Sequence, residues 1–191
     1  MAPYNCGMYC EYCDEKFTGR IVARFCSTKC RVYFHRAEKR LRIPPDELTE
    51  LDRWVRHRSK KPMTVKNRAA SSTNPATWAS FSAVSASRVG HGFGFVLNGD
   101  GIACVDLDHC IVGGVLEPWA QEILDRCPRT FVEISPSGTG LHIFGYATLG
   151  AGWRRGNVEA YDRGRYMTVT GKRWKCFPRT LANIQDLIAS L

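Results

Sequence analysis

The sequence predicts an α+β body preceded by a small zinc-binding module. Two close cysteine pairs stand near the N-terminus, and short apolar stretches of strand length occur in pairs between residues 92 and 170. Helical patterns precede, separate and follow those stretches, which is typical of an α+β domain. We therefore assign residues 1–42 to the zinc-binding module and residues 43–191 to the body.

The cysteine content favours metal binding over disulfide bonds. Nine cysteines is an odd number, five of them lie within the first thirty residues, and the polar segment 1–12 is unlike a signal peptide. No apolar run approaches the roughly 18 residues that a membrane span needs. We therefore expect a cytoplasmic protein with no membrane partner.

The spacing of the cysteines predicts one structural zinc site. The expected ligands form a C-x₂-C pair and a C-x₃-C pair, namely Cys10, Cys13, Cys26 and Cys30. The segment resembles short treble-clef zinc fingers with an F-C-S-x-x-C-R signature. Four thiolates leave no open coordination position, so this zinc should stabilise the fold and not catalyse. Cys6 or His35 could replace a ligand, although each is more simply a bystander.

Two helices are predicted next, over residues 28–40 and 45–58. The second has its apolar side chains at helical spacing: Leu48, Leu51, Trp54 and Val55. Its other side is basic, with Arg53, Arg56, Arg58, Lys60 and Lys61. These cations could follow a phosphate backbone or form a solvated face, and both interpretations stay open. Residues 1–68 hold 16 Lys and Arg against 8 Asp and Glu, which is most of the net charge of +9.

The remaining pattern predicts three β-hairpins between helices. The strands are expected at 92–97 with 102–107, at 130–134 with 141–146, and at 157–161 with 165–170. Helices are expected at 76–87, 117–126 and 180–191. Cys104, Cys110, Cys127 and Cys176 are expected to be small buried side chains.

Each hairpin carries a polar cluster at a comparable place. The clusters are Asp106 and Asp108, then Ser135, Ser137 and His142, then Glu159 with Asp162, Arg163 and Arg165. If the strands form one sheet, the three clusters can meet on one surface. Carboxylates that lie so close together repel each other unless a cation binds between them. Their oxygen atoms are hard ligands, which suit Mg²⁺ or Mn²⁺. A Ser/Gly turn, a histidine and arginines can hold a triphosphate, so the clusters indicate nucleotidyl transfer.

The three clusters resemble the motifs of the archaeo-eukaryotic primase superfamily, most closely its phage and plasmid primase-polymerase branch. The motifs are V-D-L-D-H-C at 105–110, E-I-S-P-S-G-T-G-L-H-I at 133–143 and V-E-A-Y-D-R-G-R-Y-M-T-V-T-G at 158–171. The resemblance runs from about Trp54 to Trp174. It implies an RRM-like catalytic core and synthesis from nucleoside triphosphates on a DNA template, in the cytoplasm of a bacterial host if a phage encodes the chain.

The resemblance also implies residue roles. The catalytic metal ligands are Asp106, Asp108 and Glu159, with Asp162 as the alternate third acid. The nucleotide-binding residues are Ser135, Ser137, Gly138, His142, Arg163 and Arg165. Relatives in this branch commonly continue into a helicase domain, so a separate helicase is a possible partner. Many primases also place zinc within or after the catalytic region and not before it.

Two other function classes stay open. The chain could be a catalytically inactive, zinc-containing DNA-binding protein of replication, which would bind template and make no product. It could also be a metal-dependent nuclease, since nucleases use clustered carboxylates too. The histidine beside a Ser/Gly turn fits nucleotide binding better than DNA cleavage.

Overall fold

A computed structural model describes residues 8–19, 23–40, 43–175 and 177–191. Cys6 and Cys176 lie outside these ranges, and the side chain of His35 is not described. The helices are α1 (Thr28–Arg40), α2 (Asp46–Thr49), α3 (Phe81–Ala86), α4 (Pro118–Arg126) and α5 (Gln185–Ala189), with a 3-10 turn at Pro75–Thr77. The strands are β1 (Trp54–Arg58), β2 (Lys61–Met63), β3 (Gly92–Asn98), β4 (Ile102–Leu107), β5 (Ile111–Val112), β6 (Val115–Leu116), β7 (Phe131–Ile134), β8 (Leu141–Tyr146), β9 (Trp153–Arg155), β10 (Val158–Tyr161) and β11 (Arg163–Val169).

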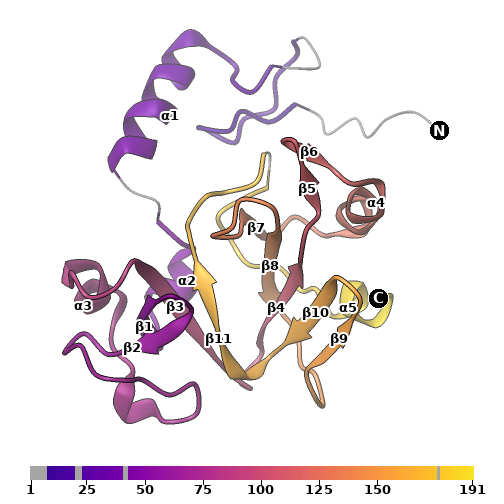
Figure 1. The fold of residues 1–191 in the computed structure, drawn as a ribbon. Helices are drawn as coiled ribbons and strands as arrows, with labels where there is room; N and C mark the ends of the chain where they lie inside the picture. Colours follow the sequence, from indigo (N-terminus) through magenta and orange to yellow (C-terminus); the bar gives the residue numbers. More distant parts are fainter. Residues whose placement is uncertain (1–7, 20–22, 41–42, 176) are drawn as a thin grey trace.

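The described chain is a mixed α/β structure with two main sheets (Figure 1). One sheet has the strand order β11-β3-β1-β2 and the other β7-β8-β4-β10-β9, while β5 and β6 form a separate small hairpin. All pairs within the two main sheets are antiparallel. Strands β4 and β7 therefore run parallel on either side of β8, and α4 connects them.

Two of the three predicted hairpins are wrong. β3 and β4 do not pair with each other, because β3 lies between β1 and β11 whereas β4 lies between β8 and β10. The chain crosses between the sheets again from β10 to β11. The chain bends at residues 99–101, but the two strands are largely buried and each pairs with the strands that complete its own core. Only the β7–β8 hairpin, across residues 135–140, is confirmed.

The predicted helix over residues 45–58 is also wrong in its second half. α2 ends at Thr49, and Trp54–Arg58 is strand β1. Trp54 pairs with Phe95 in β3 and bridges Ala79, so its backbone hydrogen bonds lie across the sheet. Trp54 and Val55 are both buried, and a strand covered on both faces can imitate helical spacing. The predicted helices at 76–87 and 180–191 shorten to α3 and α5.

Two hydrophobic cores lie on opposite faces of β4. Ala103, Val105 and Leu107 pack with α4 and α5, as Figure 1 shows on the side away from the four-stranded sheet. Ile102 and Cys104 point the other way, into a core shared with β1, β3 and β11. The burial predicted for Cys104, Cys110 and Cys127 is confirmed. No helix in the described part of the chain is long and apolar enough to cross a membrane.

Candidate functional site

A row of five polar residues crosses the five-stranded sheet, one from each strand. The pairing register places them side by side in the order Glu133, His142, Asp106, Glu159 and Arg154. We call these five residues the polar row. The preceding row on the same face is formed by Phe131, Phe144, Cys104 and Tyr161, three of which belong to the buried core between the sheets. Because side chains two residues apart on a strand share a face, the polar row borders that core.

Asp106 stands at the centre of the polar row. Its Oδ1 lies 3.7 Å from Nε2 of His142. That oxygen is buried and has no hydrogen-bond partner. Burial raises the pKa of Asp106, His142 opposes this, and the charges of Asp108 and Glu159 raise the pKa further. A buried carboxylate oxygen without a partner, beside two more carboxylates, fits a divalent cation.

His142 is held from its other side by Glu133. Nδ1 of His142 lies 3.1 Å from Oε1 of Glu133, and both side chains are buried. Burial opposes the charged imidazolium, but the hydrogen bond and charge of Glu133, with the charges of Asp106 and Asp108, raise the pKa of His142. The carboxylate of Glu133 also accepts hydrogen bonds from the Thr170 and Gly171 backbone N–H groups just after β11. Glu133 thus ties the polar row to the other sheet.

Glu159 is the third predicted catalytic acid, and it lies directly opposite Asp106. Its Oε1 is 3.1 Å from Nη1 of Arg154, and its Oε2 accepts a 2.7 Å hydrogen bond from the hydroxyl of Tyr161. Arg165 in turn donates to that hydroxyl over 2.9 Å. The structure therefore brings the predicted Glu159 and Arg165 into one connected group beside Asp106.

Asp108 lies one residue beyond the end of β4. Its N–H donates to the carbonyl of Asn157 over 2.8 Å, which holds the chain next to the start of β10. Among the described residues, the only group of three or more metal-ligand side chains with all ligand atoms within 4.8 Å is formed by cysteines. Asp106, Asp108 and Glu159 are therefore neighbours, but their carboxylate oxygens are spaced more widely than the ligands of a single metal ion.

The predicted nucleotide-binding turn connects β7 to β8 at the same end of the sheet. Ser135 and Ser137 share a 2.9 Å hydroxyl contact, and Gly138 takes a φ of +78° with open space around its Cα. A Cβ on Gly140 would lie 2.8 Å from the carbonyl oxygen of Leu107, so only glycine lets the turn approach the end of β4 this closely. The turn therefore stands beside the segment that carries Asp108.

Asp162, the alternate third acid, takes no part in the polar row. It is fully buried and accepts a 2.9 Å hydrogen bond from the N–H of Leu149. Arg163 pairs with the same carboxylate at 2.9 Å. Burial works against ionisation, but Arg163 and the Leu149 N–H hold the pKa of Asp162 below its usual range. This ion pair stabilises the corner where the chain passes from β10 in one sheet to β11 in the other. It also occupies Arg163, which the sequence predicted to bind the nucleotide.

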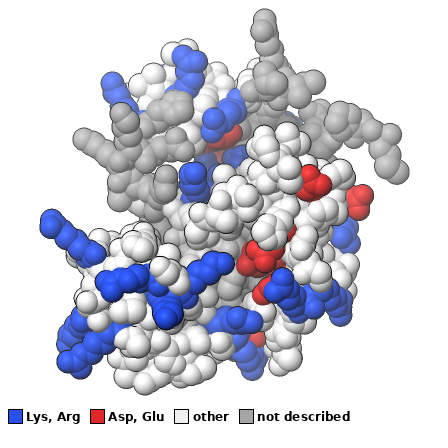
Figure 2. Space-filling model, viewed as in Figure 1, with Lys and Arg blue, Asp and Glu red and all other residues white. Residues whose placement is uncertain are grey.

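Sequence reasoning assigned no role to Glu133, Arg154 or Tyr161, and it named Lys60 only as one of the cations that could follow a phosphate backbone. The alternation of side chains along β7 and β8 puts Glu133 and His142 on definite faces, but only the register shows that they face each other. Lys60 belongs to the two-residue turn between β1 and β2, where it takes a φ of +62°. Its charge is among those that lower the pKa of Asp106 against burial. Figure 2 shows acidic side chains over the five-stranded sheet with basic side chains on both sides.

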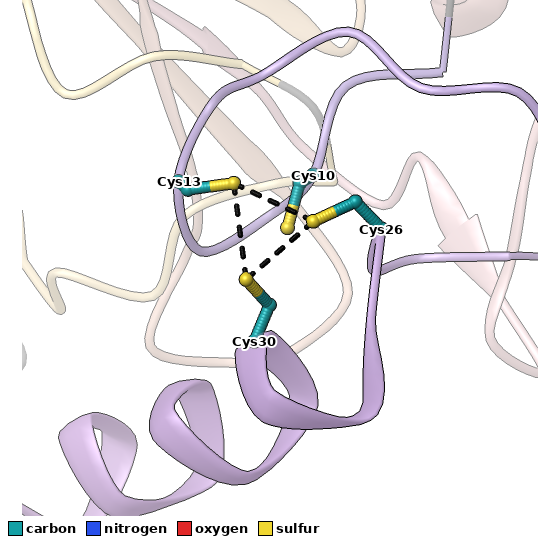
Figure 3. Close-up of side chains that lie close together, drawn as sticks. All are labelled: Cys10, Cys13, Cys26 and Cys30. Atoms are coloured by element: carbon teal, nitrogen blue, oxygen red, sulfur yellow. Dashed lines mark hydrogen bonds between the residues drawn. The ribbon is translucent and has the colours of Figure 1, made fainter.

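The four predicted zinc ligands come together in the N-terminal module (Figure 3). The sulfur atoms of Cys13, Cys26 and Cys30 lie 3.5–3.8 Å apart. Four sulfurs around a tetrahedral Zn²⁺ with Zn–S bonds of about 2.3 Å would be about 3.8 Å apart, so the cluster has the size of a zinc site. Burial raises the pKa of the Cys10 thiol, but backbone hydrogen bonds from Cys26, Cys13 and Tyr12 lower it to about 6.

The cysteine cluster rests on the body through Arg173. Nη1 of Arg173 lies 3.3 Å from the carboxylate of Asp14, and Nη2 donates to the carbonyl of Glu11. Both acceptors stand in or next to the turn of the first cysteine pair. The backbone of Arg173 bridges Glu133, so Arg173 links the module to β7, whose Glu133 hydrogen-bonds His142.

The fold and site define a mixed α/β protein with a carboxylate–histidine surface and a candidate structural zinc site. No family model matches the chain. The chain is similar to a DNA primase-polymerase of Nitratiruptor phage NrS-1, with 35% identity over 134 residues. The match covers 62% of this chain and 18% of that protein, so the chain spans less than a fifth of the relative's length. The similarity supports a relationship to primase-polymerases.

Proposed function

We propose that this chain is a template-directed nucleotidyltransferase of DNA replication, a primase-polymerase. The observation that carries the proposal is the register that places Asp106 between His142 and Glu159. An acidic pair beside a buried histidine provides metal ligands and a phosphate contact on one surface. The phage relative, which is named a DNA primase-polymerase, supports the same class of reaction.

In this reaction the 3′-hydroxyl oxygen of the growing strand bonds to the α-phosphorus of a nucleoside triphosphate. The bond from that phosphorus to the pyrophosphate oxygen breaks. We assign Asp106, Asp108 and Glu159 as the residues that would hold two Mg²⁺ or Mn²⁺ ions. Such ions supply positive charge that offsets the triphosphate and favours the attacking alkoxide. The buried oxygen of Asp106 that lacks a partner is the atom in best agreement with this assignment.

The remaining polar side chains would position the nucleotide. His142, held through Nδ1 by Glu133, presents Nε2 toward Asp106 and can donate to a phosphate oxygen. The turn with Ser135, Ser137 and Gly138 offers hydroxyl and N–H donors at the same end of the sheet. Arg154 neutralises Glu159 and is itself largely exposed, so it can exchange that contact for a phosphate.

We further propose that the five-stranded sheet is an RRM-like core. The strand order β7-β8-β4-β10, with α4 crossing from β4 to β7, is the arrangement of a split βαβ unit with an added antiparallel strand. For the N-terminal module we propose one structural Zn²⁺ on four thiolates, which would stabilise a segment that has few other means of folding.

The experiment is primer extension with labelled deoxynucleotides and Mg²⁺ or Mn²⁺. Asp106→Asn and Asp108→Asn should each lower the rate at least about 100-fold, because each removes charge that the transition state needs. Asp186→Asn in α5 is the matched control, since this side chain is exposed on the helix behind the sheet, and it should retain the wild-type rate. Undiminished synthesis by the double variant Asp106→Asn/Asp108→Asn would overturn the proposal.

A catalytically inactive DNA-binding protein is the second candidate. The observation in its favour is the ion pair of Glu159 with Arg154, which occupies the third acid. Wild-type chain that binds template and forms no product in either metal would favour this candidate.

A further inference from the structure

One segment carries nearly the whole excess positive charge of the chain. Residues 53–99 contain no Asp or Glu, and they hold Arg53, Arg56, Arg58, Lys60, Lys61, Lys66, Arg68 and Arg88. We call this stretch the basic segment. It contains β1, β2, α3 and β3, whereas the polar row lies on the other main sheet. The acids of the polar row and the cations of the basic segment thus lie in different parts of the fold.

Two of the eight cations are committed to the fold. Arg53 is buried and pairs with Asp100 at 2.7 Å. Arg56 is also buried, where it donates to the carbonyl oxygens of Val89 and Val84. The other six side chains are exposed, and Figure 2 shows basic side chains gathered over this part of the molecule. With no carboxylate in the segment to pair with, these six are suited to an anionic partner.

Two of the exposed cations border a hollow. A pocket of about 570 Å³ lies between β1, the turn near residue 67 and the end of α3. Its charged lining comes from Arg58 and Arg88, and Val65, Ala83 and Ala86 supply an apolar wall. Arg58 is oriented by a 3.1 Å hydrogen bond from its Nη2 to Oδ1 of Asn67. The pocket is within the roughly 300–1,000 Å³ of small-ligand sites, and it combines cations with an apolar surface.

We propose that this hollow binds one nucleotide of the template strand as single-stranded DNA, with the phosphate between Arg58 and Arg88 and the base against the apolar wall. Single strands can turn a base out of the stack into such a site, whereas the bases of a duplex stay stacked and paired. The identification of the strand as the template rests on the proposed function, but the binding does not. The contact is largely electrostatic, so it tolerates any base sequence.

The basic segment leads from this hollow toward the polar row. Arg58 stands opposite Lys61 at the end of the β1–β2 pair, and Lys60 forms the turn between them. The carbonyl of Lys60 accepts a hydrogen bond from the hydroxyl of Tyr166 in β11, which ties the turn to the neighbouring strands. A strand held at Arg58 can therefore continue past Lys60 to the acids of the other sheet.

The test is the affinity of the full chain for a fluorescent oligothymidine, followed by anisotropy without nucleotides or added metal. Arg58→Gln/Arg88→Gln should weaken binding about tenfold and reduce the slope of log affinity against log salt by about 0.7, since the two side chains hold one phosphate and each phosphate contact to a single strand contributes about 0.7. Arg126→Gln removes a charge from α4, behind the other sheet, and should change affinity less than about twofold.

A second pair of variants tests the hollow without changing charge. Ala86→Leu narrows the pocket, whereas Ser85→Leu adds the same side chain to the neighbouring exposed position of α3 that does not line it. Only Ala86→Leu should weaken binding. Wild-type affinity and salt slope in both Arg58→Gln/Arg88→Gln and Ala86→Leu would overturn the inference.

The inference and the proposed function can fail separately. Asp106→Asn/Asp108→Asn should lose synthesis and keep the affinity for oligothymidine, which supports the hollow as a binding site independent of the acids. A wild-type chain that makes no product but depends on Arg58 and Arg88 for binding would refute the proposed function and support the inference. Thermal unfolding of each variant at the wild-type temperature excludes misfolding as the cause.

Discussion

Glu133 offers a sharp test of how the polar row is held together. Its carboxylate is fully buried and contacts Nδ1 of His142 through one oxygen. The other oxygen accepts from the backbone N–H groups of Thr170 and Gly171 at 3.0 and 2.7 Å. In Glu133→Gln one oxygen can keep the backbone bonds, but the amide NH₂ then faces His142. The imidazole must present a lone pair at Nδ1, so its proton should move to Nε2.

The expected magnitude follows from the charge that is lost. A hydrogen bond to a charged group contributes about 1.5–3 kcal/mol and a neutral one about 0.5–1.5 kcal/mol, so Glu133→Gln should lower the free energy of unfolding by about 1–1.5 kcal/mol. For a chain of this size about 1 kcal/mol corresponds to about 2–4 °C, which gives a fall in Tm of about 2–6 °C. Glu133→Ala leaves His142 without its partner and should cost more, about 3–5 kcal/mol.

Thermal unfolding followed by circular dichroism measures the stability, and nitrogen NMR of the His142 ring reports which nitrogen carries the proton. Glu122→Gln on the exposed side of α4 is the matched control and should shift Tm by less than about 2 °C. If Glu133→Gln unfolds like this control and the His142 ring signals stay unchanged, Glu133 does not position the histidine.

Three further predictions concern the zinc module and the packing of the sheets. Metal analysis should find about one zinc per chain, lost together with α1 helicity in Cys30→Ser and kept in Cys127→Ala; normal helicity without zinc would contradict a structural role. Asp162→Asn should cost about 1–3 kcal/mol at pH 7, measured by urea unfolding. Arg163 and the Leu149 N–H outweigh burial and hold the folded-state pKa of Asp162 below 3.8. The loss of stability in Asp162→Asn should therefore be full above pH 3.8 and shrink as the pH falls through the folded-state pKa, and a loss that is independent of pH would refute this role of Asp162. In Gly94→Ala the new Cβ would lie 2.4 Å from Cδ2 of Tyr166, so the substitution should lower the free energy of unfolding by about 1–3 kcal/mol. Tyr166→Ala should relieve this clash, which a double-mutant cycle measured by urea unfolding would show.

Features that depend on short stretches of chain were predictable. The C-x₂-C and C-x₃-C spacing brought four sulfurs to one place, because the first pair flanks a tight turn and the second pair spans the start of α1. The β7–β8 hairpin and α4 agree with their predicted positions for the same reason, since a tight turn and an amphipathic helix are encoded by neighbouring residues. The zinc itself, and the roles of the acids, stay predictions.

Features that depend on which strands pair were not predictable. Trp54–Arg58 became a strand because β3 offered it backbone partners, although its apolar spacing matched a helix. The order of the two sheets, and with it the row in which Glu133, His142, Asp106 and Glu159 stand side by side, follows from burying both cores at once. Asp162 is equally acidic in the sequence, yet the crossing between the sheets turns it inward to Arg163 and Leu149.

The amino-acid order alone therefore specifies the chemistry that is present, namely thiolates at zinc spacing, carboxylates at strand ends and a long stretch that holds cations but no carboxylate. Tertiary packing selects which of those groups face one another, because the hydrogen-bond register between distant strands exists only once both hydrophobic cores have formed.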